Sequence, residues 1–156
     1  MAVTTFLREF EYMISKYEEL NTLSNAGNDR QRCFLLVDDD PVCLRNMMSW
    51  LQNFYQVAVA KSGAACLAFL GKNKPDLILL DYEMPVTTGP QVLEMLRSDP
   101  STASIPVMFL TNKSDRTSVL AAVDLKPEKY LLKTMKPMEV LKSINEYFET
   151  EKAKSY

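Results

Sequence analysis

The chain has 156 residues, of which 47% are hydrophobic and 24% are charged, and its net charge at pH 7 is −2. This length suits one domain with a full core, and the composition is that of a soluble globular protein. No segment concentrates Lys and Arg as a nucleic-acid-binding domain does, so we expect no direct contact with nucleic acid. No apolar run could cross a bilayer and no signal peptide is visible, so we expect a cytoplasmic protein that does not bind a membrane.

The chain contains no histidine. A Ser-His-Asp or Cys-His catalytic unit therefore cannot form, and a zinc site would lack its commonest nitrogen ligand. The three cysteines, Cys33, Cys43 and Cys66, include no Cys-x-x-Cys pair and lie in apolar stretches, which indicates reduced core thiols. Any chemistry must then use carboxylates, hydroxyls, lysines and a hard metal ion.

Residues 1–32 differ in pattern from the rest of the chain. Apolar side chains recur there at spacings of four, three, four and three, at Phe6, Phe10, Met13, Tyr17 and Leu20. This spacing predicts one amphipathic helix, and the polar residues 21–31 that follow predict a linker. We expect this helix either to pack against its own domain or to be the end of a linker from a larger protein. The same spacing also fits a two-helix contact in a homodimer, which we rank second.

From Cys33 to about Thr150, short apolar runs alternate with stretches of helical periodicity. The apolar runs are Cys33–Val37, Tyr55–Ala60, Leu77–Leu80, Pro106–Leu110 and Tyr130–Leu132. The helical stretches are Pro41–Asn53, Gly63–Leu70, Gly89–Arg97, Asp115–Val123 and Pro137–Thr150. Runs that are apolar throughout suit strands buried on both faces, and five strand–helix units in succession predict an α/β fold with a parallel sheet. We expect residues 33–150 to form this domain and residues 151–156 to form a tail.

Polar residues stand directly before four of the predicted helices. They are Asp40, Ser62, Thr88 and Ser114, and a proline follows Asp40 at the first helical position. Side chains of this kind accept the unpaired N–H groups of a helix amino terminus. We therefore predict that each one caps the helix that follows it.

Polar or charged residues also mark the carboxyl ends of four of the predicted strands. Asp38 and Asp39 follow the first strand, Asp81 follows the third, Thr111 ends the fourth and Lys133 follows the fifth. Open parallel sheets bind ligands at this edge. Two carboxylates about 4 Å apart repel by ~4 kcal/mol at an effective dielectric near 20, so a converging set needs a counter-charge, and oxygen ligands favour Mg²⁺. Such a site could stabilise a transferring phosphoryl group, with Asp81 as the nucleophile.

These residues resemble the receiver domain of response regulators in two-component phosphorelay systems. The match comprises Phe34–Pro41, Asp76–Pro85, Gly89, Ile105–Thr111 and Tyr130–Lys133. The resemblance covers about residues 33–150 and implies a flavodoxin-like, CheY-like fold. In that fold five helices surround a five-stranded parallel sheet of order 2-1-3-4-5, which places the first and third strands side by side.

The resemblance implies a role for each acidic residue. Asp81 corresponds to the phosphoacceptor, and Asp39 corresponds to the direct ligand of the Mg²⁺ cofactor. Asp38 would bind the same ion through water, and Glu83 would offer its backbone carbonyl. The chain would then be a phosphoprotein that catalyses only its own phosphorylation and dephosphorylation.

The resemblance also implies how the signal enters and leaves. Lys133 would pair with the phosphoryl oxygens, while Thr111 and Tyr130 would act as a switch pair that changes the surface for partner binding or dimerisation. The donor would be a phosphohistidine on a sensor histidine kinase or a histidine phosphotransfer protein. The sequence does not indicate the downstream target.

Three features depart from the family's pattern. Thr134 follows Lys133 where the family usually has proline, and because a cis bond before a non-proline residue costs ~3–4 kcal/mol, we predict a trans bond and a shifted loop. Lys126–Lys129 replaces a small turn and makes the output face charged. Glu83 and Lys113 flank the path of an attacking water, and we expect them to pair and to prolong the life of the aspartyl-phosphate.

Two other interpretations stay open on the sequence. Asp38–Val42 matches the Asp-x-Asp-x-Val/Thr signature of haloacid-dehalogenase-like phosphatases, in which Asp38 would be the nucleophile and Asp40 the general acid. The order of Asp81 before Thr111 argues against this class, as does the lack of an acidic residue at a strand end after Lys133. The second interpretation is a degenerate receiver that acts only as an interaction module, because the position after the lysine is not proline.

Overall fold

The computed structural model describes residues 8, 11, 12, 15, 32–112 and 126–154. The chain divides into two units, residues 1–30 and residues 31–156. In the first unit, the described residues Arg8, Glu11, Tyr12 and Ser15 are helical. The five apolar residues of the predicted stripe lie outside the described part, so the homodimer contact stays a prediction.

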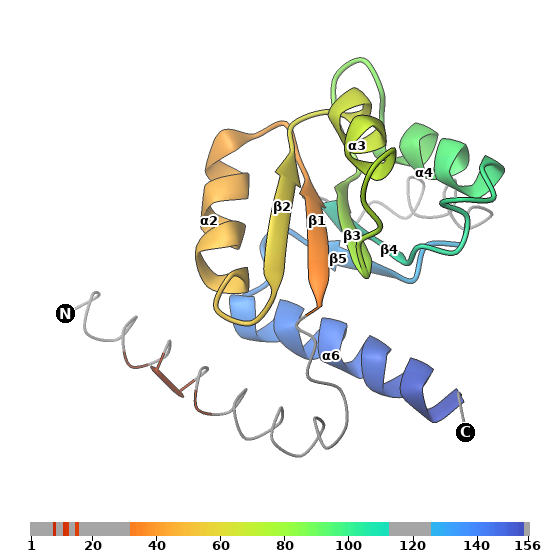
Figure 1. The fold of residues 1–156 in the computed structure, drawn as a ribbon. Coiled ribbons are helices and arrows are strands. Elements are labelled where there is room, and N and C mark those ends of the chain that lie inside the picture. Colours follow the sequence, from red (N-terminus) through yellow and green to blue (C-terminus); the bar gives the residue numbers. More distant parts are fainter. Residues whose placement is uncertain (1–7, 9–10, 13–14, 16–31, 113–125, 155–156) are drawn as a thin grey trace. The chain divides into compact units, whose positions relative to one another are not determined.

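The second unit is built on one parallel sheet. Its strands are β1 (Cys33–Val37), β2 (Gln56–Ala60), β3 (Leu77–Asp81), β4 (Val107–Thr111) and β5 (Lys129–Leu132). They lie in the order β2-β1-β3-β4-β5, and every neighbouring pair is parallel (Figure 1). The predicted flavodoxin-like sheet is therefore confirmed, and each predicted strand is displaced by one residue at most.

Helices connect the strands and cover both faces of the sheet (Figure 1). Those described are α2 (Pro41–Leu51), α3 (Gly63–Leu70), α4 (Gly89–Ser98) and α6 (Pro137–Lys154). The predicted helix over 115–123 lies outside the described residues. Two predicted ends are wrong. Helix α2 stops before Asn53, whose side-chain amide donates to the carbonyl oxygens of Ser49 and Trp50 and closes the last turn.

The end of α6 is the second correction. The helix runs on to Lys154, so most of the predicted tail is helical. Glu, Lys and Ala favour helix, and the Lys154 ammonium lies 3.0 Å from a carboxylate oxygen of Glu151, one turn earlier. The same segment therefore continues the helix instead of ending it.

Three of the four predicted caps are present. The side chain of Asp40 accepts the N–H of Val42 at 3.0 Å, and Ser62 accepts the N–H of Ala65 at 3.0 Å. Thr88 and Gln91 form a reciprocal capping box at the start of α4. Ser114, the fourth, lies outside the described residues.

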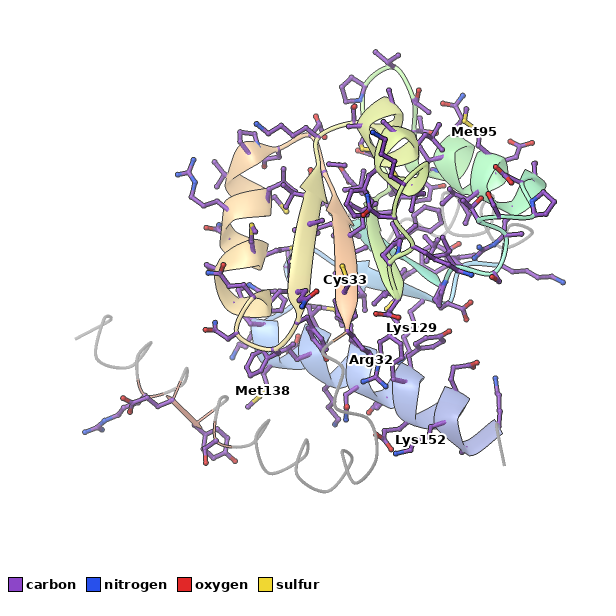
Figure 2. The ribbon with its side chains drawn as sticks, in the orientation of Figure 1. Arg32, Cys33, Met95, Lys129, Met138 and Lys152 are labelled. Carbon is purple, nitrogen blue, oxygen red and sulfur yellow. The ribbon has the colours of Figure 1, made fainter. Side chains whose placement is uncertain are left out.

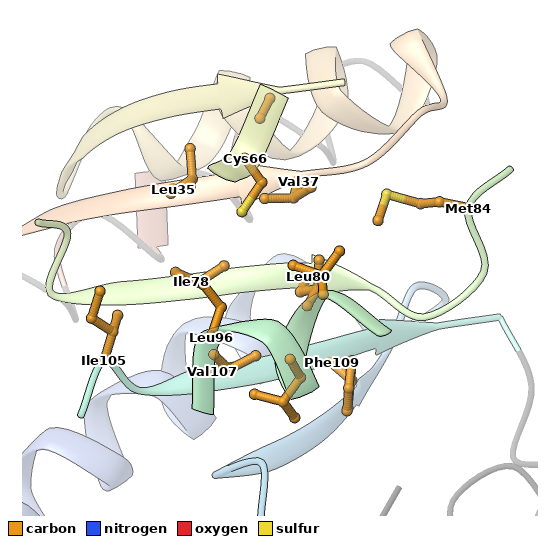
Figure 3. Packing of buried hydrophobic residues seen from close by; sticks show 13 residues of the cluster. Leu35, Val37, Cys66, Ile78, Leu80, Met84, Leu96, Ile105, Val107 and Phe109 are labelled. Carbon is orange, nitrogen blue, oxygen red and sulfur yellow. The ribbon is translucent and has the colours of Figure 1, made fainter. Parts of the chain in front are cut away.

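Alternate residues of a strand face opposite sides of the sheet, and in β1, β3 and β4 the residues on both sides are almost all buried, whereas the edge strands β2 and β5 are only partly buried. One side forms a cluster with α3 and α4 (Figure 3), whose members include Leu35, Val37, Ile78, Leu80, Val107, Phe109, Cys66, Val92, Leu93 and Leu96. On the other side the ring of Phe34 stacks on that of Phe148 in α6, with 6.0 Å between centroids. Burial on both faces explains why the strands are apolar without alternation.

The three cysteines are free thiols: Cys66 is buried, and Cys33 and Cys43 are half-buried. Among the helices that the structure describes, none has the length and apolar character needed to span a membrane.

Candidate functional site

Three carboxylates gather where β1 and β3 end. The two strands are neighbours, and Val37 in β1 lies beside Leu80 in β3, so Asp38 and Asp81 emerge at the same edge. One carboxylate oxygen of each of Asp38, Asp39 and Asp81 can be chosen so that all three lie within 4.8 Å of one another. Asp38 and Asp81 are buried, whereas Asp39 is exposed. Strand order thus brings together acids that are more than 40 residues apart in the chain.

Lys133 connects the two buried acids. Its ammonium lies 2.7 Å from Oδ2 of Asp38 and 3.1 Å from Oδ1 of Asp81. The backbone N–H of Lys133 also donates to the carbonyl oxygen of Thr111 at 2.8 Å, which fixes the start of this loop against the end of β4. Two buried carboxylates therefore share a single lysine.

Asp38 is ionised in this arrangement. Its Oδ1 accepts the N–H of Asp40 at 2.9 Å, while Oδ2 is buried and has no well-aligned hydrogen-bond donor among the described residues beyond its ion pair with Lys133. Burial alone would raise the pKa of Asp38, but its contacts with Lys133 and the Cys43 thiol outweigh burial and lower it. Of the two buried carboxylates, Asp38 therefore makes the closer ion pair with Lys133.

The thiol of Cys43 is a member of the site that the sequence did not indicate. Cys43 lies in the first turn of α2, against the carboxylate of Asp38. Burial, and then the nearby Asp38 carboxylate, raise the pKa of Cys43 to about 12, so the thiol keeps its proton. A cysteine in an apolar stretch gives no sequence signal for such a contact, because only folding turns it toward the acid.

Asp81 is the acid that remains under-neutralised. Its Oδ1 accepts the N–H of Glu83 at 3.3 Å in addition to its contact with Lys133. Burial, followed by the charge of Asp38, raises the pKa of Asp81 to about 7. A second cation at this edge would relieve that cost, and a donor set made of carboxylate oxygens fits Mg²⁺. The described residues therefore suit the ion that the sequence predicts.

Gly89 lets the loop after β3 return to the carboxyl end of that strand. Its N–H donates to the carbonyl oxygen of Tyr82 at 3.0 Å. A Cβ added at Gly89 would lie 2.3 Å from the carbonyl oxygen of Asp81 and 2.9 Å from the Cα of Tyr82. No side chain fits there, so a glycine is needed for backbone approach at this position.

The two predicted switch residues lie on β4 and β5. Thr111 is half-buried and is the last residue of β4, one position beyond Leu110, which pairs with Asp81. Tyr130 lies beside Phe109 across the sheet, with 5.5 Å between ring centroids. Burial, and then the nearby Tyr82, raise the pKa of Tyr130. The structure thus records one half-buried position for this ring.

The three departures from the family pattern are partly described. No peptide bond among the described residues is cis, so the bond from Lys133 to Thr134 is trans, as predicted. Lys129, the last residue of the charged segment 126–129, is the first residue of β5, and its ammonium donates to the carbonyl oxygen of Ser143 at 3.0 Å (Lys129 is labelled in Figure 2). Glu83 is exposed, but its predicted partner Lys113 lies outside the described residues.

A hollow of about 380 Å³ opens beside the acidic cluster. Most of its lining is apolar and comes from α2, the ends of β4 and β5, and the start of α6. The polar lining includes Lys133, Cys43 and Asn46, and the single tryptophan, Trp50, forms part of the apolar wall. A side chain that enters this hollow would therefore lie close to Lys133.

Residues 34–145 match the family model described as the response regulator receiver domain. The "Probable cyclic di-GMP phosphodiesterase" of Vibrio cholerae is 31% identical over 140 residues, which are 79% of this chain and 32% of that protein. "Protein PilH" of Pseudomonas aeruginosa is 32% identical over 112 residues, which are 71% of this chain and 93% of PilH. The solved structure of the "Phosphorylated Cyanobacterial Phytochrome Response Regulator RcpA" is 27% identical, with a TM-score of 0.68 over 76% of this chain and 94% of that chain. The chain therefore belongs to the response regulator receiver family of two-component phosphorelay signalling.

Proposed function

We propose that Asp81 accepts a phosphoryl group from a phosphohistidine and that this transfer is the signal the chain receives. The observation that carries the proposal is the geometry of Asp81, a buried acid with a raised pKa beside Asp38, Asp39 and Lys133. A nucleophilic carboxylate needs nearby cations to approach an anionic phosphoryl group. A relative of this fold, RcpA, was solved in a phosphorylated form, which further supports the proposal.

The metal cofactor in this proposal is Mg²⁺. Asp39 and Asp81 would bind it directly, Asp38 through a water molecule, and Glu83 through its backbone carbonyl. The under-neutralised charge of the acidic cluster supports this assignment, because two buried carboxylates share one lysine. When bound, Mg²⁺ would neutralise negative charge on the transferred phosphoryl group.

The chain's own residues orient the reacting acid. The Glu83 N–H and the Lys133 ammonium both hold Oδ1 of Asp81, so the carboxylate keeps one orientation. An oxygen of Asp81 attacks the phosphorus, the new O–P bond forms as the P–N bond breaks, and the histidine nitrogen keeps the bonding electron pair. Lys133 can then pair with a phosphoryl oxygen in place of the Asp81 carboxylate.

The response would follow from the neighbouring β4 and β5. Thr111 would donate its hydroxyl to a phosphoryl oxygen, and Tyr130 would turn further inward behind it. Tyr130 is only half-buried beside Phe109, which supports a further inward rotation of its ring. The altered surface would bind a partner protein or a second copy of the chain in the cytoplasm, without chemistry on any other substrate.

The donor would be a sensor histidine kinase or a histidine phosphotransfer protein. The hollow between α2 and α6 supports docking next to the site, because its apolar lining reaches Lys133. An apolar side chain beside the donor histidine would fill it and bring the phosphorus toward Asp81. The response regulator family uses such donors, so this partner class is the one we favour.

The phosphatase alternative has less support. In that class Asp40 would act as general acid, but here its side chain accepts the N–H of Val42 and caps α2. Asp40 is also exposed, unlike the buried Asp38 and Asp81. The same carboxylate cannot easily serve as a helix cap and a proton donor.

The test is phosphorylation of the full chain by acetyl phosphate in the presence of Mg²⁺, followed by intact-protein mass spectrometry. We expect one phosphoryl group on the wild type, none on Asp81→Asn, and one on Asp40→Asn, which serves as the matched control. The degenerate-receiver interpretation predicts no phosphoryl group on any of the three. Retention of the group in Asp81→Asn together with its loss in Asp38→Asn would assign the nucleophile to Asp38 instead.

A further inference from the structure

Helix α3 is unusual because it has no polar face. Its sequence from Gly63 to Leu70 contains only glycine, alanine, cysteine, leucine and phenylalanine. A helix that is apolar on all sides is normally buried. Here α3 lies next to α4 on one face of the sheet (Figure 1), and only part of its circumference is covered.

The two sides of α3 are clearly distinguished by burial. Cys66 is fully buried in the core cluster, and Phe69 and Leu70 pack against that cluster. The opposite side consists of exposed residues, namely Ala64, Ala65, Leu67 and Ala68. Leu67 keeps 37% of its surface exposed, which is high for a leucine in a helix of this composition. An apolar strip of small residues around one leucine therefore faces outward.

Lysines border this strip at both ends. Lys61 precedes the helix, while Lys72 and Lys74 follow it, and all three are exposed. The sequence from residue 41 to residue 75 contains no aspartate or glutamate, although the whole chain has a net charge of −2. The two ends of the apolar strip therefore carry three exposed lysines, and segment 61–75 has no acidic residue to neutralise them. We call the four exposed residues and the three lysines the α3 surface.

We propose that the α3 surface binds an amphipathic helix of a partner protein that carries acidic residues at both ends of its apolar face. Leu67 would contact that apolar face, and the lysines at the two ends of α3 would pair with the acidic ends of the partner helix. Charge complementarity selects this partner over a basic helix.

The alanines favour a helix over a membrane surface. Small side chains allow two helix backbones to approach closely, so that contact is made along the whole strip. Membrane-surface helices instead insert large apolar side chains such as Trp, Phe and Leu into the lipid. The α3 surface presents one leucine among three alanines, which suits helix packing and gives little to insert.

Lys61 follows Ala60, whose carbonyl oxygen accepts the N–H of Asp38, but none of the seven residues belongs to the acidic cluster, so the proposal does not depend on phosphorylation. It adds a second place on the chain at which a partner is recognised. Its side chains are exposed, but Leu67 keeps only 37% of its surface open to solvent and so also makes contacts within the chain. The folding of each variant is therefore measured together with its binding.

The experiment is a titration of isotopically labelled full-length chain, followed by NMR chemical shifts. The probe is a synthetic helical peptide with leucines on one face and glutamates at both ends of that face, and the control peptide has lysines in place of the glutamates. We expect shifts confined to α3 and the three lysines with the acidic peptide. We expect binding to weaken as salt is added, and the lysine peptide to bind at least about tenfold more weakly.

Paired variants separate the two contributions. Leu67→Glu should weaken binding of the acidic peptide at least about tenfold, whereas Met95→Glu, on the exposed side of α4, should leave it unchanged. The double variant Lys72→Glu, Lys74→Glu should also weaken binding, whereas Lys142→Glu on α6 should not. Phosphorylation by acetyl phosphate and the circular dichroism spectrum report that each variant is folded.

Four outcomes would overturn the proposal. The first two are equal binding of the acidic and basic peptides, and equal effects of Leu67→Glu and Met95→Glu on that binding. Another is binding of anionic lipid vesicles through α3 without binding of the acidic peptide, which would assign the surface to a membrane. The last is a rise of molecular mass with protein concentration that Leu67→Glu abolishes, since the surface would then be occupied by a second copy of the chain.

Discussion

The two ends of β1 and β3 use aspartates in opposite ways. At the amino ends, a carboxylate oxygen of Asp76 accepts the N–H of Cys33 at 2.8 Å, and the N–H of Asp76 donates to the carbonyl oxygen of Cys33 at 2.7 Å. At the carboxyl ends, Asp38 and Asp81 are buried and share the charge of Lys133. One end joins two strands through neutral donors, and the other holds charge that the fold only partly neutralises.

This difference separates an acid that builds the sheet from acids that carry chemistry. A backbone N–H that donates to a half-buried carboxylate offsets most of the free energy lost by burying it. The carboxylate of Asp76 therefore does not need a bound cation. Buried like charges that share one cation are unfavourable for folding and favourable for binding another cation. The carboxyl edge should therefore respond to metal, pH and charge substitution, and the amino edge should respond only to loss of its hydrogen bonds.

The largest effect is expected from Lys133→Met. In metal-free buffer near neutral pH the substitution leaves Asp38 buried without its cation, and we expect a loss of about 3–5 kcal/mol in the free energy of unfolding. Lys129→Met is the matched control, because Lys129 pairs at 3.7 Å with an exposed Glu146, and we expect about 1 kcal/mol or less. Urea unfolding measures both, and equal losses would show that Lys133 is not the counter-charge of the cluster.

Asp81→Asn should stabilise the metal-free protein. Burial and the charge of Asp38 raise the pKa of Asp81 to about 7, from 3.8 in the unfolded chain, so between these values the folded protein binds a proton that the unfolded chain releases. The stability of the wild type therefore falls as pH rises through this window, whereas an asparagine has no proton to lose. We expect the variant to be more stable by roughly 2–4 kcal/mol at about pH 8 and by little at about pH 4.

Mg²⁺ provides the control for that prediction. Saturating Mg²⁺ should raise the melting temperature of the wild type and should have much less effect on Asp81→Asn. An advantage for the variant that is the same at both pH values would contradict the raised pKa. An equal response of both proteins to Mg²⁺ would place the ion away from Asp81.

Asp76→Ala should lower stability by a smaller amount, and that amount should not depend on Mg²⁺. It removes an acceptor from the N–H of Cys33, at the amino end of β1 (Figure 2), and we expect a loss of about 1–2 kcal/mol in the free energy of unfolding. Asp76→Asn keeps a carbonyl oxygen as acceptor and should lose less. Mg²⁺ should raise the melting temperature of Asp76→Ala by as much as it raises that of the wild type. A smaller rise in the variant would show that the amino edge and the carboxyl edge of the sheet are energetically coupled.

The smallest effect is expected from Asp40→Ala. Loss of the cap on the N–H of Val42 should destabilise the protein by about 1 kcal/mol. Phosphorylation by acetyl phosphate should continue, because Asp40 is a cap and not a member of the reacting set. Loss of phosphorylation in a variant that remains folded would bring Asp40 into the site.

The sequence by itself determined the strands, their parallel order and the edge at which the acids meet. Strands buried on both faces are apolar without interruption, so Asp38, Asp81, Thr111 and Lys133 stand out at the points where those runs end. Capping by Asp40, Ser62 and Thr88 is equally local and was predicted. Helix ends were less accurate, because Asn53 and the Glu151–Lys154 pair act through contacts one turn away.

Only the tertiary structure decided which of the acids are buried and which of them lies closest to Lys133. Asp38 takes the closer contact with Lys133, Cys43 turns its thiol toward Asp38, and Gly89 admits the backbone of Asp81. These features depend on distances between residues far apart in the chain, which no local pattern contains. The exposure of α3 has the same origin, because an apolar sequence indicates that a helix can be buried but not how much of it the neighbouring elements cover.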